Sequence, residues 1–356
     1  MSQEIASFLS SLVTLVPLYR TSLLFLVCLL LGAGGAWLIA DIPFRDSLLD
    51  HPGHRSSHTV ATPRGGGVGI LIAFIAAAVT LRVPTTFLFA AVLVSAVSFY
   101  GDYFRISVKF RLAIQFLSAS IFMLPLLPKL VLFFDASRIG SVVFLFPLIL
   151  IALVAFVVGT ANFYNFMDGI NGIAGLSGAI GFGILGLYTL YRPGVSQFEA
   201  SFSLLSIGLA LSCLGYLPFN MPRARVFMGD VGSILLGFVF AALVIVLSRN
   251  YRDMICLPSI LFPFYADELT TMYARVRAGE NLTKAHRSHL YQLLVNDCGI
   301  AHWKVATAYG LLQLLVGTAA LALYSIGLNM VMLLLVTSFL IFSVVSYKVR
   351  KKVSRV

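Results

Sequence analysis

The sequence predicts an all-α polytopic membrane protein, and three observations support this fold class. Hydrophobic residues make up 59% of the 356 residues and charged residues only 11%, whereas soluble domains average about half apolar and a quarter charged. About eleven apolar stretches are long enough to cross a bilayer as helices. No linker or internal repeat divides the chain, so we expect one membrane domain over residues 1–356. The stretches begin near residues 20, 66, 85, 112, 142, 173, 201, 232, 255, 305 and 329.

The first stretch, near residue 20, is predicted to be a retained span and not a signal peptide. It ends in LGAGGA, which has the small residues of a cleavage site, but no clear basic region precedes it. Cleavage there would also leave the next loop on the wrong side of the membrane.

Polar loops at alternate ends of the spans form the candidate site. If successive spans alternate in direction, these loops reach one membrane face, where their side-chain oxygens could gather around a divalent cation. We expect the catalytic loops to be residues 41–67, 101–111, 162–172, 218–231 and 275–304.

The first of these loops contains DHPGHRSSHTVATPRGGG. Its two prolines and three consecutive glycines resist helix formation, so its backbone is expected to line a cavity or rim instead of facing lipid. Arg55, His58 and Arg64 in this loop are candidate phosphate contacts.

The second loop, YGDYFRISVKFR, places Asp102 beside Arg105, Lys109 and Arg111. An ordinary basic loop next to the membrane would explain the cations alone. With an acid among them, the loop also fits an anionic substrate held by Lys and Arg while Asp102 organises a metal or accepts a proton.

In NFYNFMDGINGIAG, Asn162, Asn165, Asp168 and Asn171 recur every three residues and share a face if the turn is helical. Carboxylate and amide oxygens suit Mg²⁺, which usually takes one or two carboxylates together with water and substrate phosphates. A capped helix terminus is the structural alternative. Four such residues within ten favour a binding site.

The FMGDVGS motif places Asp230 between two glycines at the start of the eighth predicted span. A helix N-terminus offers free N–H groups and the positive end of the helix dipole. Asp230 could act simply as an N-cap, but its small neighbours also leave room for a phosphate or metal near the backbone.

The last loop contains AHRSHLYQ, which places His286 and His289 on one face of a helix. No Cys, third His or HExxH motif accompanies them, so a zinc site is not expected. They fit better as hydrogen-bond donors to a phosphate group beside Arg287.

Asp267 and Glu268 precede this loop, in the cytoplasmic half of the ninth predicted span. Carboxylates inside a membrane are costly and default to a functional interpretation. Pairing with Arg275 or Arg277 is the structural alternative.

The net charge of +11 comes from Lys and Arg dispersed among the loops, which argues against nucleic-acid binding. The positive-inside rule makes the face with the catalytic loops cytoplasmic, with the N-terminus periplasmic and the C-terminus cytoplasmic. The basic tail KVRKKVSRV is expected to lie against anionic lipid. The cytoplasmic face is expected to carry all of the 25 basic residues except Arg20, Arg82, Lys129, Arg138, Arg192, Arg249 and Arg252.

Five motifs together resemble the bacterial polyprenyl-phosphate N-acetylhexosamine-1-phosphate transferases of glycosyltransferase family 4, relatives of the phospho-N-acetylmuramoyl-pentapeptide transferase of cell-wall synthesis. The resemblance extends over nearly the whole chain, and the RSHLYQ version resembles the branch that starts O-antigen or capsule repeats. The chain departs from the family in two places, with Gly101 before Asp102 where adjacent aspartates are usual, and without a tandem histidine pair. The motifs are HRSSHTVATPRGGG, GDYFRISVKFRLAIQ, NFYNFMDGINGIAG, FMGDVGS and ENLTKAHRSHLYQ.

The resemblance implies transfer of an N-acetylated sugar 1-phosphate from a UDP-sugar to undecaprenyl phosphate at the cytoplasmic face of the bacterial inner membrane, releasing UMP. It also implies Mg²⁺, with Mn²⁺ as a substitute, held by Asn165, Asp168 and Asp230. The catalytic residues would be Asp102, Asp168, Asp230, His286 and His289. The substrate-binding residues would be Arg55, His58, Arg64, Lys109, Asn171 and Arg287.

Direct attack by the lipid phosphate on the UDP-sugar is the expected route, because a phosphate monoester with a second pKa near ~6 is mostly dianionic at pH 7. A covalent aspartyl intermediate is the alternative.

A secondary transporter for an anionic solute is the rival function, since transporters also have many spans and Gly-rich breaks. Transporters bind near the bilayer midplane, often between repeated halves. Here the acids lie at the ends of the predicted spans and no repeat is visible, so an enzyme is favoured.

Overall fold

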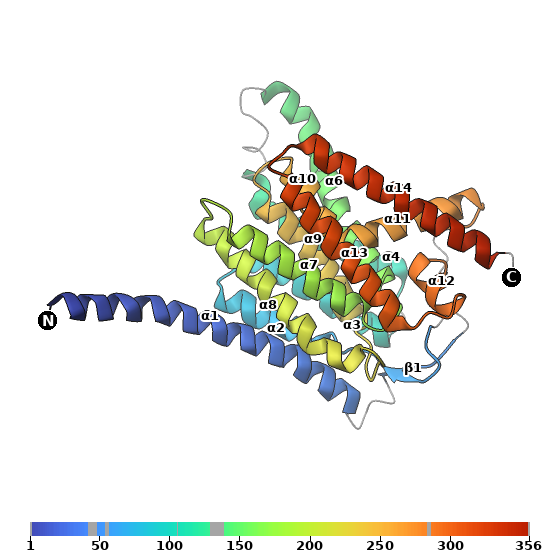
Figure 1. Cartoon of the computed structure of the whole chain (residues 1–356), viewed down its shortest axis with the longest axis horizontal. Helices are drawn as coiled ribbons and strands as arrows, with labels where there is room; N and C mark the ends of the chain where they lie inside the picture. Colours follow the sequence, from blue (N-terminus) through green and yellow to red (C-terminus); the bar gives the residue numbers. More distant parts are fainter. Residues whose placement is uncertain are drawn as a thin grey trace.

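The computed structural model describes residues 2–41, 48–53, 57–104, 106–128, 139–282 and 286–354, with the backbone alone for 2–18 and 139–145. These residues form a helical bundle with one two-stranded hairpin (Figure 1). Its elements are α1 (Ser2–Asp41), β1 (Leu49–Asp50), β2 (Thr62–Pro63), α2 (Val68–Thr80), α3 (Thr85–Tyr103), α4 (Val108–Met123), η2 (Leu124–Leu126), α6 (Ile139–Phe166), α7 (Ile173–Leu190), α8 (Gln197–Asn220), α9 (Asp230–Leu247), α10 (Asp253–Cys256), η4 (Pro258–Leu261), α11 (Phe262–Arg277), α12 (Leu290–Asn296), α13 (His302–Leu323) and α14 (Leu328–Val353).

The predicted helical membrane class is confirmed, but the count of eleven spans is not. Nine helices within the described ranges are long and apolar enough to cross a membrane. The stretch near residue 66 gives only the 13-residue α2. The stretch near residue 255 is broken into α10, η4 and the polar α11, because Pro258 and Pro263 interrupt regular helical hydrogen bonding. Orientation in the membrane stays a prediction.

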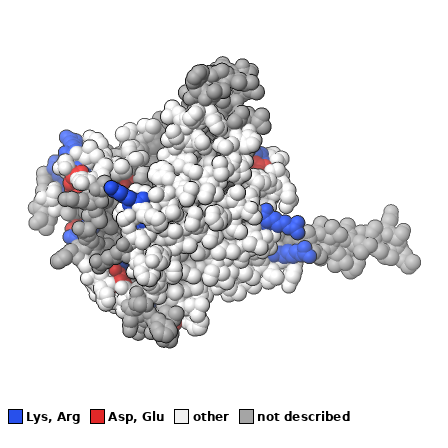
Figure 2. Space-filling view, turned by 180° about the vertical axis from the view of Figure 1, so that it is seen from behind, with Lys and Arg blue, Asp and Glu red and all other residues white. Residues whose placement is uncertain are grey.

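Charged side chains on the face shown in Figure 2 gather at the two ends of the bundle, with an uncharged belt between them. This distribution matches a protein whose middle lies in hydrocarbon, where charges are costly.

Helix α9 is the centre of the bundle. Every residue from Val231 to Leu247 is buried, and α9 packs against α3 and α6. Its apolar character on all sides allows other helices to surround it completely. Burial of α9 fixes the place of its N-terminal residue, Asp230.

Helices of alternating direction bring the polar loops to one end of the bundle. Helices α3, α6 and α8 end there, and α9 and α13 begin there, near the β1–β2 hairpin at the right of Figure 1. The start of α1 and the end of α14 lie at opposite ends of the molecule.

Backbone pairing joins the first polar loop to the segment before α9. The N–H groups of Gly65 and Gly66 donate to Phe227 O at 3.1 and 2.9 Å, and Gly67 N–H donates to Met228 O at 2.9 Å. A side chain on Gly67 would overlap the backbone of α9, so this close approach requires glycine. The predicted non-helical loop therefore forms part of the site, in the residues that are described.

At the opposite end, a network of ion pairs ties the loop after α7 to the end of α9. Arg249 donates to both Glu199 oxygens at 2.7 and 3.0 Å and to Pro193 O at 2.7 Å. Asp253 accepts from Arg192 at 3.0 Å and from Arg249 N–H at 2.7 Å. Asp253 is buried and Glu199 partly buried, and these bonds hold neighbouring helix ends together.

We expect Arg249→Ala to destabilise the protein more than Arg252→Ala, which removes an exposed arginine from the same loop. Loss of the charged hydrogen bonds costs roughly 1–3 kcal/mol, because Glu199 is left without its guanidinium. Thermal unfolding in detergent measures the difference. Equal melting temperatures for the two variants would show that the network adds no stability.

Candidate active site

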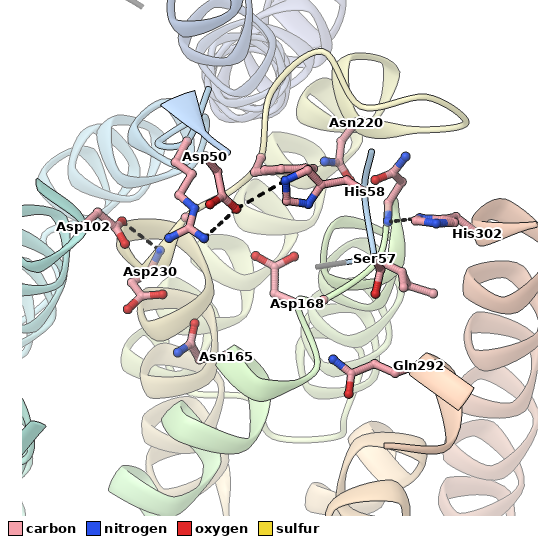
Figure 3. Close-up of a pocket in the computed structure, with 16 residues that line it drawn as sticks. Asp50, Ser57, His58, Asp102, Asn165, Asp168, Asn220, Asp230, Gln292 and His302 are labelled. Carbon is pink, nitrogen blue, oxygen red and sulfur yellow. Dashed lines mark hydrogen bonds and ion pairs between the residues drawn. The ribbon is translucent and has the colours of Figure 1, made fainter. Parts of the chain in front are cut away.

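A polar cavity of about 330 Å³ opens at the end of the bundle where the predicted catalytic loops meet (Figure 3). Its walls come from five separate stretches of chain, which is why the site depends on the whole bundle. The lining residues are Asp50, Ser57, His58, Arg64, Asp102, Asn165, Asp168, Gly169, Ile170, Asn171, Asn220, Phe227, Gly229, Asp230, Gln292 and His302.

Asp102 and Asp230 are joined through the backbone. The Asp102 carboxylate, in the last turn of α3, accepts the N–H of Asp230 at 3.0 Å. Asp230 is the first residue of α9, so Asp102 satisfies one of the free N–H groups at that helix end. The Asp230 carboxylate itself pairs with Arg111 of α4. Gly229, not Asp230, is the N-cap, with φ of +74°.

Asp168 lies in the loop just after α6 and points into the middle of the cavity between Asp230 and Ser57 (Figure 3). Asn165, the second-last residue of α6, lines the same wall and accepts a 2.7 Å hydrogen bond from Ser233 of α9.

Asn220 fixes the other end of the Asp168 loop. Its side chain accepts from Gly172 N–H at 2.6 Å and donates to Val226 O at 2.9 Å. Gly172 has φ of +86°, a conformation that L side chains rarely adopt. The loop therefore needs both glycine and the Asn220 clamp.

The predicted every-third-residue face is only partly found. Asn165, Asp168 and Asn171 line the cavity. The helix ends at Phe166, so Asp168 and Asn171 reach the cavity from a loop and not from a helical face. Asn162 points elsewhere, because it donates to Gln115 of α4 at 2.6 Å.

Negative charge dominates the centre of the cavity. Burial first, and then repulsion by the carboxylates of Asp230 and Asp102, raise the pKa of Asp168 well above its usual value, against an opposing effect of Arg64. A cation among these oxygens would relieve the repulsion. The donor set consists of carboxylate and amide oxygens, which magnesium prefers.

The first loop supplies a basic wall. Arg64 donates to Asp50 at 2.6 Å, and the ring of His58 lies against Phe227 at 4.8 Å between centroids. His58 Nε2 is 3.8 Å from the Asp50 carboxylate. Arg64 and His58 thus reach the cavity, while Arg55 and Arg105 lie outside the described residues.

Several lining residues were not among the sequence candidates. His302 accepts the backbone N–H of Asn171 at 3.2 Å, and Gln292 and Asp50 also face the cavity. Each of these residues lies inside a predicted catalytic loop, but its spacing from other polar residues in the sequence does not distinguish it from the rest of the loop. Asn220 could have been found only as a polar residue at the end of an apolar span.

Four predicted residues do not line this cavity. Lys109 and Arg287 are exposed elsewhere at the same end. His289 is buried, with its ring nitrogens 3.7 Å from Asp267 and 3.6 Å from Glu268.

His286, the fourth of these residues, stacks obliquely on His289 at 4.8 Å. Partial burial, and then the charges of His289 and Arg275, lower the pKa of His286 to about 4, so its ring is neutral at pH 7. Its predicted role in phosphate binding stays a prediction.

Comparisons with known proteins agree with the geometry. A model of the glycosyl transferase family 4 matches residues 84–248, which include Asp102, Asn165, Asp168 and Asp230. The chain is 27% identical over 359 residues to the decaprenyl-phosphate N-acetylglucosaminephosphotransferase of Mycobacterium leprae, covering 90% of this chain and 88% of that protein. It is 34% identical over 117 residues to the protein of the same name from Mycobacterium tuberculosis H37Rv, covering 29% of each.

A further match is the phospho-N-acetylmuramoyl-pentapeptide-transferase of Staphylococcus saprophyticus, 33% identical over 130 residues, covering 35% of this chain and 39% of that protein. The first match runs almost the full length of both chains, and the family model covers the acid and amide residues gathered in the cavity. Residues 84–248 of the chain are therefore similar to glycosyl transferase family 4.

Proposed function

We propose that the protein transfers an N-acetylated sugar 1-phosphate from a UDP-sugar to a polyprenyl phosphate, undecaprenyl phosphate in particular, and releases UMP. The observation that carries this proposal is the cavity at one bundle end, which joins Asp102, Asp168 and Asp230 to the basic residue Arg64. The relatives are named as transferases of this kind. We assign the step to the start of O-antigen, capsule or related envelope polysaccharide synthesis at the cytoplasmic face.

Asp168, Asp230 and Asn165 are proposed to hold Mg²⁺. Within the described ranges, no three acidic, His or Cys side chains are already spaced to hold a metal ion. Magnesium takes one or two carboxylates and completes its shell with water and substrate phosphates, so this smaller set fits it. When bound, the ion supplies charge neutralisation of the pyrophosphate oxygens.

The reaction needs no proton removal by the protein. An oxygen of the acceptor phosphate attacks the β-phosphorus of the UDP-sugar, the bond from that phosphorus to the bridging oxygen breaks, and UMP leaves with this oxygen. A phosphate monoester is mostly dianionic at pH 7, because its second pKa is near ~6. The site therefore acts by positioning the two substrates and by neutralising the charge of their phosphates.

Asp102 fits a positioning role in this scheme. One of its carboxylate oxygens already accepts the N–H of Asp230 and holds the start of α9. Arg64 and His58 also line the cavity, where they can bind phosphate oxygens.

The test of the proposed function is UMP release by purified protein in detergent with undecaprenyl phosphate and a panel of UDP-N-acetylhexosamines. We expect magnesium-dependent release with at least one sugar and lipid-linked pyrophosphoryl sugar as product. Sugar uptake into proteoliposomes without UMP release would instead support a transporter.

With that assay, Asp230→Asn is expected to lower turnover roughly 100-fold or more, since electrostatic stabilisation by one group is typically worth that much. The matched control is Asp41→Asn, which changes an exposed carboxylate paired with Arg225 and outside the cavity. The control should retain activity. Equal losses of turnover in both variants would show that Asp230 is not part of the active site.

Asp102→Asn distinguishes positioning from base or nucleophile chemistry. An amide oxygen can still accept the Asp230 N–H, so we expect turnover to fall by roughly tenfold or less, whereas Asp102→Ala removes the acceptor and should cost about 100-fold. Loss of all activity in Asp102→Asn would overturn the positioning role, and trapping of labelled sugar phosphate on the protein without lipid would exclude the direct route.

A further inference from the structure

Asp267 is a fully buried carboxylate that lies outside the cavity and is the centre of a hydrogen-bond network. It belongs to α11, and none of its surface is exposed. One oxygen accepts from Leu290 N–H at 2.8 Å and from Thr271 Oγ1 at 3.1 Å. The other accepts from Tyr291 N–H at 3.1 Å and from Tyr309 Oη at 2.6 Å.

These bonds fix the start of α12. Leu290 and Tyr291 are its first two residues, and their N–H groups have no partner inside the helix. Asp267 satisfies both, and Tyr309 joins the same carboxylate to α13. A single side chain of another helix therefore satisfies the first two N–H groups of α12 and links this helix to α13.

Helix α12 in turn supports the loop that carries Asp168. The buried Tyr291 hydroxyl donates to Phe166 O at 2.8 Å and accepts the N–H of Gly169. A side chain at Gly169 would overlap that hydroxyl, so the two parts are in close contact. The next residue, Gln292, lines the cavity beside Gly169.

We propose that Asp267 is a positioning residue that acts through α12 and Tyr291 to hold the Asp168 loop in its working place. Two hydrogen-bonded steps connect it to the residues on either side of Asp168. The inference rests on the proposed function only where it concerns turnover, because the structural connection is testable without substrate.

Glu268 provides a matched control. It is adjacent in sequence and also buried, but its carboxylate lies 3.6 Å from His289, and within the described part of the chain its Oε2 has no hydrogen-bond partner. Glu268→Gln removes a buried charge without touching the α12 backbone.

Hydrogen–deuterium exchange of the full-length protein in detergent tests the connection without substrate. In Asp267→Asn, peptides covering residues 290–296 and 166–172 should both exchange roughly tenfold faster, because opening of the start of α12 also releases the loop that Tyr291 holds. In Tyr291→Phe, only the 166–172 peptide should change, and in Glu268→Gln neither should. Unchanged exchange at 166–172 in both Asp267→Asn and Tyr291→Phe would overturn the inference.

Kinetics supply the second readout. We expect Asp267→Asn to lower kcat roughly 10- to 100-fold with KM within about threefold, since small displacements of reacting groups carry costs of this size. If Asp267 acts through Tyr291, the double variant Asp267→Asn/Tyr291→Phe should lose no more than the larger single loss. A double variant whose loss of kcat equals the product of the two single losses would overturn the inference.

The outcomes separate this inference from the proposed function. A wild-type protein that turns over no UDP-sugar but shows the expected exchange pattern would overturn the function and support the connection. An active wild type with an Asp267→Asn variant that matches Glu268→Gln in exchange and kcat would overturn the connection alone.

Discussion

The contact on which the site depends is the backbone pairing of Gly65, Gly66 and Gly67 with the segment that precedes α9. Hydrogen bonds to Phe227 and Met228 hold the first polar loop against the N-terminus of the most buried helix. These three glycines are buried, and backbone groups buried away from water need hydrogen-bond partners within the protein. The same pairing places Arg64 and His58 in the cavity that the acids line.

Around this contact, each acid is held by a different neighbour. Asp102 is held by the N–H of Asp230, and Asp230 by Arg111. Asp168 lies on a loop that is clamped at one end by Asn220 and at the other by Tyr291. Like charges at this spacing repel one another, and the surrounding fold supplies the energy that keeps them together. Such a site suits the magnesium ion and the pyrophosphate chemistry that we propose for it.

The two ends of the bundle have different tasks. At the far end, Arg249, Glu199 and Asp253 pair fully with one another and with carbonyl groups, and the result is stability. At the cavity end, Asp168 faces an open polar space beside other acids, and the result is a site that can bind a ligand. Both arrangements place charge outside the apolar belt, where water screens it and burial costs less.

The sequence by itself determined the membrane class, the loops that meet and the acids they carry, because composition and helical period act locally and apolar length sets what crosses a bilayer. It also brought out the GDVGS and DGING motifs as parts of one site. Only the tertiary structure decided that α2 is short, that Asn162 turns away and that His289 is buried beside Asp267. These features depend on which helices pack together, and contacts between distant residues leave no trace in local spacing.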